Sequence, residues 1–226
     1  MDAATTRWCS IDGLCNRQTL ELGQCSLIPA SLHKEVMETN KSLQDQIAAW
    51  TFDCIGPPTE CGTSEWQLQV FEQSTFCVEE LGEVARAIAK AQSGVRPDTD
   101  WNAEIPKELG DLFITLHIFA TRIGFRIDAH NYPSFAPVQD LRHSDSGRIC
   151  VASKVLEASR ALGEIGYALT MSFTHPSEWD AVSDKLDDAL IALYALSSCL
   201  GVDLDVAVRD RWENTISKRL NGTRSD

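Results

Sequence analysis

Residues 77–83 read CVEELGE, and residues 107–111 read KELGD. Each segment holds two carboxylates that are three residues apart, which places them on one face of a helix. The four residues are Glu80, Glu83, Glu108 and Asp111. Four carboxylates on facing helices would repel one another strongly unless a cation lay between them. The two segments therefore predict a metal site held by a pair of helices.

The first acidic segment lies in a long predicted helix over residues 65–92, which the Ser93-Gly94 pair ends. Its apolar stripe is predicted to consist of Val78, Leu81, Ala85, Ile88 and Ala89. Residues 95–104 are polar and are predicted to form a loop that contains Trp101.

The second acidic segment lies in the next predicted helix, which Ile105-Pro106 opens and which ends near Gly124. Its predicted core residues are Leu109, Leu112, Phe113, Leu116, Phe119 and Ala120. His117 lies on the same apolar helix and is interpreted as a structural histidine.

The rest of the chain also favours helices. Helical periodicity recurs from Ser31 to about Cys54 and over residues 150–171, 178–200 and 205–220, and no segment alternates as a half-buried strand. The predicted fold class is therefore all-α, a helical bundle of mostly antiparallel helices. The predicted domains are an N-terminal arm (1–30), an active helical unit (31–128), a linker (129–148) and a degenerate helical unit with a closing helix (149–226).

The two halves of the sequence resemble each other. Residues 107–116 align with residues 184–193, and residues 123–128 align with residues 200–205. In this alignment the four acidic positions correspond, in order, to Glu157, Arg160, Lys185 and Asp188. The alignment predicts a tandem duplicated helix pair. Because cations replace two of the carboxylates in the second copy, that copy is predicted to be inactive. The alternative is that any two amphipathic helix pairs share such a pattern.

At these residues the chain resembles a family. The patterns EELGE at 79–83 and ELGD at 108–111, together with GVDLDVAV at 201–208 and Arg211-Trp212, are similar to the signature of the MazG-like all-α nucleoside triphosphate pyrophosphohydrolases. This resemblance covers about residues 43–219 and implies a helical bundle that binds Mg²⁺, with Mn²⁺ as an alternative. The implied reaction converts a (d)NTP to a (d)NMP and pyrophosphate, in nucleotide-pool cleaning or balance. The duplicated layout resembles the dimeric dUTPase branch, in which one chain holds an active and a degenerate unit.

The implied site has a metal-binding part and a substrate-binding part. Glu80, Glu83, Glu108 and Asp111 are the predicted metal ligands, and Glu79 is a candidate for positioning water. Lys90 lies two turns beyond Glu83 and could reach a phosphate, with a solvent-exposed lysine as the alternative. By resemblance, Arg211, Asn214 and Arg219 on the last helix are candidate substrate-binding residues. Trp50, Trp66 and Trp101 could stack on a base, although core packing is the commoner role of such tryptophans.

Composition limits the functions and locations that the sequence allows. A formal net charge of -13 disfavours nucleic-acid binding. The 8 cysteines form no CxxC pair, and the start of the chain lacks the features of a signal peptide. No apolar run is long enough to span a bilayer, so a cytoplasmic location is expected. The expected partners are a nucleoside triphosphate and, as an alternative assembly, a second copy in a homodimer. The competing functions are a base-specific dUTPase or dCTPase and a non-catalytic helical assembly module.

Overall fold

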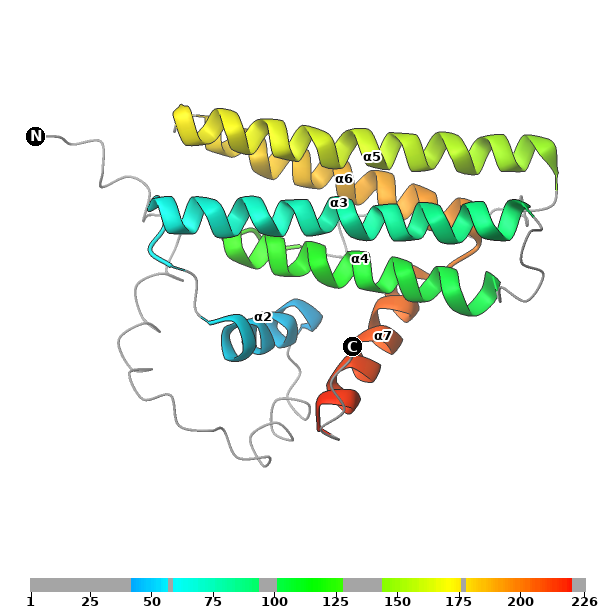
Figure 1. Ribbon diagram of the computed structural model, residues 1–226, viewed down its shortest axis with the longest axis horizontal. Coiled ribbons are helices and arrows are strands. Elements are labelled where there is room, and N and C mark those ends of the chain that lie inside the picture. The colour runs from blue at the N-terminus through cyan, green and yellow to red at the C-terminus, as the bar shows by residue number, and fades with distance from the viewer. Residues whose placement is uncertain (1–41, 57–58, 94–100, 128–143, 176–177, 221–226) are drawn as a thin grey trace, which may run out of the picture. The chain divides into compact units, whose positions relative to one another are not determined.

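A computed structural model describes residues 42–56, 59–93, 101–127, 144–175 and 178–220, and every structural statement below concerns these ranges. They form the helices α2 (Leu43–Ile55), α3 (Ser64–Ser93), α4 (Trp101–Ile123), α5 (Asp145–Thr174), α6 (Trp179–Leu200) and α7 (Leu204–Leu220) (Figure 1). No strand occurs within the described ranges, so the all-α prediction is confirmed. The predicted arm (1–30), residues 31–41 of the first predicted helix and most of the predicted linker lie outside these ranges.

Two helices begin earlier than the sequence predicts. α4 begins at Trp101, so the predicted loop over residues 95–104 is wrong at its end, and Pro106 lies inside the helix rather than in its first turn. α5 begins at Asp145, so the last residues of the predicted linker are helical. Ser144 explains the start of α5, because its hydroxyl accepts a hydrogen bond of 3.1 Å from the backbone N–H of Gly147.

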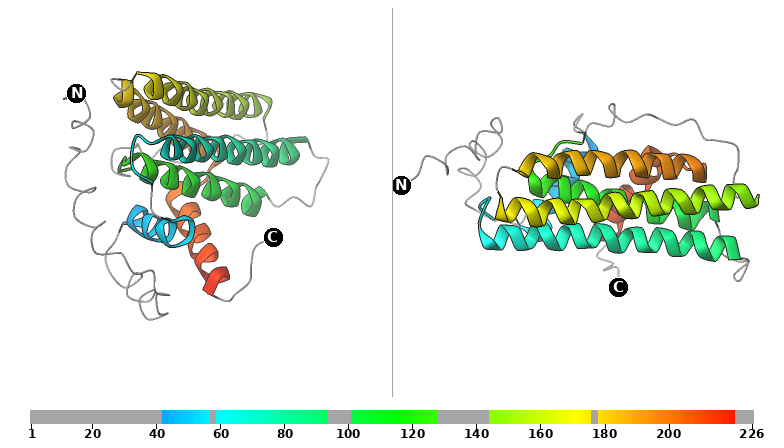
Figure 2. Two further views of the ribbon diagram at one scale, coloured as in Figure 1. Left: turned by 60° about the vertical axis from the view of Figure 1, so that its left-hand side comes forward. Right: turned by 90° about the horizontal axis from the view of Figure 1, so that it is seen from above.

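Four long helices lie side by side, and α2 and α7 pack against one of them. α3 contacts both α4 and α5, and α5 contacts α6, with neighbouring helices running in opposite directions (Figures 1 and 2). α4 also contacts α2 and α7. Residues from Ser42 onward therefore form one compact unit in which the closing helix α7 packs against α4 of the first half.

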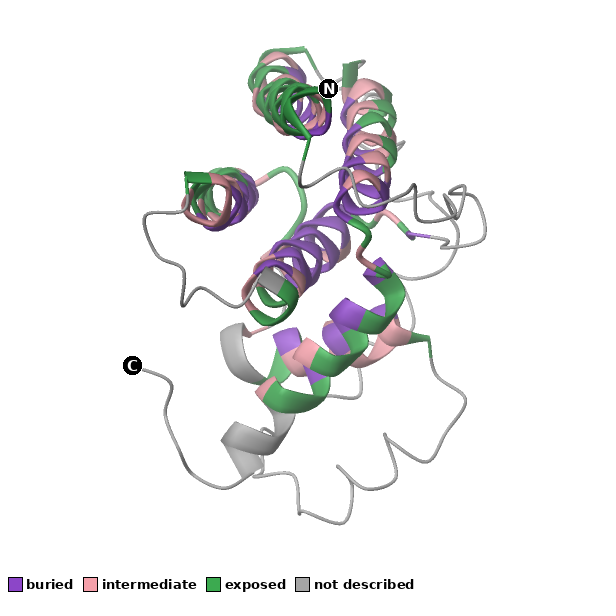
Figure 3. Cartoon of the chain, turned by 90° about the vertical axis from the view of Figure 1, so that its right-hand side faces the viewer, coloured by how far each residue is buried: buried purple, intermediate pink, exposed green. Residues whose placement is uncertain are grey.

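α4 is buried along most of its length, as Figure 3 shows. Its predicted core residues Leu109, Leu112, Phe113, Leu116, Phe119 and Ala120 are all buried, which confirms that prediction. The predicted stripe on α3 is partly wrong, because Val78 is 51% exposed and Ala89 is exposed, whereas Leu81 and Ile88 are buried. The buried face of α3 instead runs through Cys77, Leu81, Val84 and Ile88, which recur at steps of three and four residues.

No single helix among the described residues combines the length and apolarity needed to cross a membrane; α6 and α7, bent by 97°, meet those criteria only as a pair.

His117 of α4 is buried in the core, as expected for a structural histidine. Its side chain is 7% exposed and contacts the edge of Phe113, with ring centroids 5.9 Å apart. Within the described part of the chain its Nδ1 atom has no hydrogen-bond partner. Burial lowers the pKa of His117 to about 4, because the charged imidazolium would lose its hydration.

This buried imidazole predicts a loss of stability in mild acid. The folded-state pKa lies below the ordinary value, so stability present above the unfolded pKa is lost as the pH falls toward 4. Between pH 7.5 and pH 5, wild type should lose about 2 kcal/mol more free energy of unfolding than His117→Leu. Urea denaturation followed by circular dichroism at the two pH values measures the difference. His175→Gln is the matched control, because His175 is exposed, and it should behave as wild type. An equal acid loss in His117→Leu and wild type would contradict this role of His117.

Candidate metal site

α3 and α4 bring three of the four predicted metal ligands together. One carboxylate oxygen each from Glu80, Glu108 and Asp111 lies within 4.8 Å of the other two. All three side chains are partly buried at the edge of the core, because buried residues flank them on both helices. Cys77 and Leu81 are the buried neighbours of Glu80, and Leu109 and Leu112 are those of the α4 acids. We call these three residues the acidic triad.

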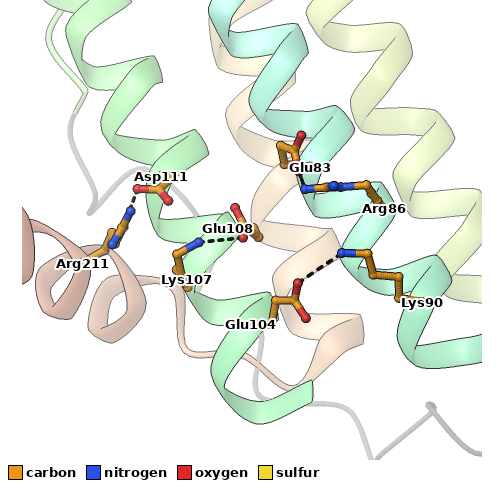
Figure 4. A network of polar contacts seen from close by, with 8 residues as sticks. All are labelled: Glu83, Arg86, Lys90, Glu104, Lys107, Glu108, Asp111 and Arg211. Atoms are coloured by element: carbon orange, nitrogen blue, oxygen red, sulfur yellow. Dashed lines mark hydrogen bonds and ion pairs between the residues drawn. The ribbon is translucent and has the colours of Figure 1, made fainter. Parts of the chain in front are cut away.

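Glu83 does not join the acidic triad in this structure. Its carboxylate forms an ion pair with Arg86 on the same helix (Figure 4), and its side chain is 39% exposed. Its charge still bears on Glu80, one turn away, although less than the charges of Asp111 and Glu108. Glu83 is therefore close enough to Glu80 for its charge to act on it, but its carboxylate is paired with Arg86.

Two cations partly neutralise the acidic triad. Arg211 of α7 donates from Nε to Oδ1 of Asp111 at 2.5 Å, and Lys107 Nζ lies 2.8 Å from Oε1 of Glu108 (Figure 4). The Arg211 and Asp111 side chains are only 22% and 20% exposed. This limited exposure reduces solvent screening and strengthens their attraction. The α4 acids therefore each have a nearby positive charge.

Glu80 lacks such a partner. Within the described ranges its side chain makes no hydrogen bond or ion pair. Burial raises the pKa of Glu80 to about 7, and the negative charges of Asp111 and Glu108 add to the effect. An ionised Glu80 is thus unfavourable until a further cation enters the cluster. Carboxylate oxygens are the donors that hard divalent cations prefer, so the acidic triad is chemically suited to hold one.

Gly110 sets the distance between α4 and α7. A Cβ atom at this buried position would lie 2.8 Å from Cβ of Arg211 and 2.9 Å from the carbonyl oxygen of Ala207. Real Cβ atoms essentially never come so close, so only glycine lets α7 approach α4 this closely. This approach brings Arg211 beside Asp111.

The other predicted site residues are spread around the acidic triad. Glu79 is exposed on α3, next to Glu80. Lys90 lies 3.5 Å from Glu104 of α4, near Glu108 in Figure 4. Asn214 is exposed and donates to the carbonyl oxygen of Asp210. The side chain of Arg219 lies outside the described residues.

The predicted base-stacking tryptophans are core residues where they are described. Trp66 is 5% exposed and packs against Trp179, with ring centroids 5.0 Å apart. Trp50 packs edge-on against the buried Trp212, with ring centroids 5.7 Å apart. The side chain of Trp101 lies outside the described residues. This arrangement favours the core role over base stacking for Trp50 and Trp66.

The sequence reasoning missed three charged residues of this network, namely Arg86, Glu104 and Lys107. Glu104 precedes Glu108 by one helical turn, a spacing that could have revealed it. It was missed because residues 101–104 were predicted as loop. Arg86 and Lys107 lie close in sequence to acids, but a nearby cation on a helix is usually only a solvated charge.

The aligned positions in the second half are neutralised by local ion pairs. Lys154 Nζ lies 2.5 Å from Glu157, and Lys185 Nζ lies 3.0 Å from Asp188. Lys185 and Arg160 both contact Glu164, at 3.0 and 2.7 Å. No carboxylate cluster of the metal-binding kind forms at these positions within the described residues. The prediction of an inactive second copy fits this charge balance, while the duplication itself stays a prediction.

Comparison with family models, curated proteins and solved structures gives no match for this chain.

Gly110 and Gly82 form a natural pair for testing how α7 packs. Gly110→Ala should destabilise the protein by about 1–3 kcal/mol, because the added Cβ collides with α7. Gly82→Ala should be neutral or stabilising by up to about 1 kcal/mol, since its Cβ meets nothing within 4 Å and alanine favours helix. Urea denaturation at neutral pH measures both. Equal stability of the two variants would show that α7 does not need this close approach.

Proposed function

We propose that this protein is a Mg²⁺-dependent nucleoside triphosphate pyrophosphohydrolase of the MazG-like kind, which converts a (d)NTP to a (d)NMP and pyrophosphate. The observation that carries the proposal is the convergence of Glu80, Glu108 and Asp111 within 4.8 Å on two packed helices. The resemblance of residues 79–83 and 108–111 to the family's acidic signature supports it. The role in nucleotide-pool cleaning or balance follows from the same resemblance.

The donor set fits Mg²⁺, and Mn²⁺ is an acceptable substitute. Mg²⁺ is held in proteins by a few carboxylates, with waters and substrate phosphates completing its shell. The acidic triad supplies three carboxylates, and uncompensated Glu80 supplies the negative charge that a cation would neutralise. Glu83 lies one turn from Glu80 and is the proposed fourth ligand, which requires it to leave Arg86.

A bound divalent cation would neutralise triphosphate charge and polarise the attacked phosphorus. The protein's own residues would do the rest by positioning. Arg211 on α7 contacts Asp111, Lys90 on α3 contacts Glu104, and each cation can donate hydrogen bonds to phosphate oxygens. Exposed Glu79 is the residue that we assign to orienting the attacking water.

Asp111→Asn tests the site, and Asp188→Asn at the aligned position of the second half is its matched control. Asp111→Asn should reduce turnover at least about 100-fold, because loss of a direct ligand exceeds the usual effect of losing a supporting residue. Asp188→Asn should leave turnover unchanged. The assay incubates each variant with a panel of (d)NTPs and Mg²⁺ and measures monophosphate and pyrophosphate. Circular dichroism verifies that both variants keep their helices.

The products separate the competing functions. Release of orthophosphate in place of pyrophosphate would overturn the proposed cleavage position. Turnover of a single pyrimidine nucleotide would identify a base-specific dUTPase or dCTPase of the same kind. Calorimetric Mg²⁺ binding without turnover of any (d)NTP would favour a non-catalytic assembly module.

Glu83→Gln tests whether Glu83 joins the site when metal binds. Loss of its charge should weaken Mg²⁺ binding and lower turnover about 10- to 100-fold, since the remaining three carboxylates stay in place. Arg86→Ala is the companion variant, because it frees Glu83 from its ion pair and should leave Mg²⁺ binding at least as tight as in wild type. Unchanged binding in Glu83→Gln would restrict the ligands to the acidic triad.

A further inference from the structure

Two cysteines from different helices meet where α5 begins and α6 ends. The Sγ atoms of Cys150 and Cys199 are 3.8 Å apart, although the residues are 49 positions apart in sequence. Both side chains are partly exposed. A disulfide needs an S–S distance of about 2.05 Å, so side-chain rotation over less than 2 Å would close this gap.

A groove of about 560 Å³ between α5 and α6 gives access to Cys199, one member of this thiol pair. Cys199 and Ser198 line it, with Ala192 and Ala195 as apolar lining and Lys154 and Arg160 as cationic lining. The carboxylates of Glu157 and Asp188 also line the groove and balance these two cations, and the volume suffices for a molecule of small-peptide size. A small reagent can therefore approach the sulfur of Cys199 from solvent.

The other two cysteines whose side chains the structure describes, Cys77 and Cys61, lack this arrangement. Cys77 is buried, its Sγ atom donates to the carbonyl oxygen of Gln73 at 3.3 Å, and burial raises the pKa of its thiol well above the ordinary range. A thiol in that state is inert toward disulfides. Cys61 is exposed on the turn before α3 and serves below as the accessible reference thiol.

The surroundings of Cys199 act on its thiol in two directions. Burial and the neighbouring thiol of Cys150 raise the pKa of Cys199, and the ammonium group of Lys154, one turn after Cys150, opposes part of that rise. The closeness of the two sulfur atoms is what favours exchange between them.

We propose that Cys150 and Cys199 form a reversible disulfide that fastens α5 to α6 when the protein meets a small-molecule disulfide of the oxidised-glutathione class. In the first step, the thiolate of one of the two cysteines attacks one sulfur of the reagent and forms a mixed disulfide, and one reagent thiolate leaves. In the second step, the thiolate of the other cysteine attacks the protein sulfur of the mixed disulfide and expels the second reagent thiolate. The protons of the two cysteines end on the two released thiols, so the protein pair is oxidised and the reagent is reduced.

This disulfide would act on the fold, separately from the proposed metal site. It links the two helices of the second half, whereas the acidic triad lies on α3 and α4. Closing a loop of this length restricts the unfolded chain and raises the melting temperature. The expected rise is about 5–10 °C for a protein of this size. The inference does not depend on the proposed enzymatic function.

The test incubates the full chain with oxidised glutathione and then with reduced glutathione. Peptide mapping by mass spectrometry without reduction should find the peptides of Cys150 and Cys199 joined, with no retained glutathione. The melting temperature should rise on oxidation and return on reduction. Cys61→Ser should behave as wild type in both measurements.

The single variants test whether both thiols are needed. Cys199→Ser and Cys150→Ser should each stop at a mixed disulfide on the remaining cysteine and show no rise in melting temperature. Wild-type protein in which Cys61 carries glutathione while Cys150 and Cys199 stay reduced would overturn the proposal, as would stable mixed disulfides at both cysteines without a cross-link.

Discussion

The structure depends on the burial of α4. This helix carries two carboxylates directly beside its buried apolar residues. Leu109, Leu112, Leu116 and Phe119 are fully buried, and α4 contacts α2, α3 and α7. A carboxylate next to such a core loses hydration, which is costly unless a cation or hydrogen-bond donors replace it. Lys107 supplies a cation for Glu108, and Arg211 supplies one for Asp111. Glu80 has neither a cation nor a hydrogen-bond donor as a partner within the described ranges, and its pKa is raised.

The aligned segments of the two halves carry different patterns of charge. Lys185 stands at the position aligned with Glu108, and Arg160 at the position aligned with Glu83. Each of these cations contacts a carboxylate of its own half, so the charges cancel locally. The position aligned with Gly110 is Asp187, whose Cβ does not permit the close approach that α7 makes to α4. The same short segment therefore governs both the charge and the packing of a third helix.

Periodicity was sufficient to predict the helices and the buried face of α4, because hydrophobic burial imposes a regular spacing. It failed where other forces act. The first four residues of α4, 101–104, show no helical apolar pattern, and the start of α5 depends on a serine cap. Val78 was misassigned because apolar character alone does not say which side of a helix faces its neighbours.

The same limits apply to the candidate site. Spacing on a helix predicted that Glu80, Glu108 and Asp111 could meet, because one helical turn fixes which residues share a face. Spacing could not predict the ion pair between Arg86 and Glu83. Long charged side chains on a surface can pair with several partners that differ little in free energy. The contact between Arg211 and Asp111 spans 100 positions and arises from tertiary packing at Gly110.

The alignment of the two halves also bears on the groove between α5 and α6. Three of its lining residues, Glu157, Arg160 and Asp188, align with Glu80, Glu83 and Asp111. In the first half α7 packs over Gly110 and places Arg211 beside Asp111. At the aligned position of α6, Asp187 stands in place of this glycine. The side chains of α6 pack against α3 and α4, as the contacts of Trp179 with Trp66 and of Tyr194 with Phe113 show. The aligned residues on its other side lie along an open groove, whereas in the first half Arg211 of α7 contacts Asp111.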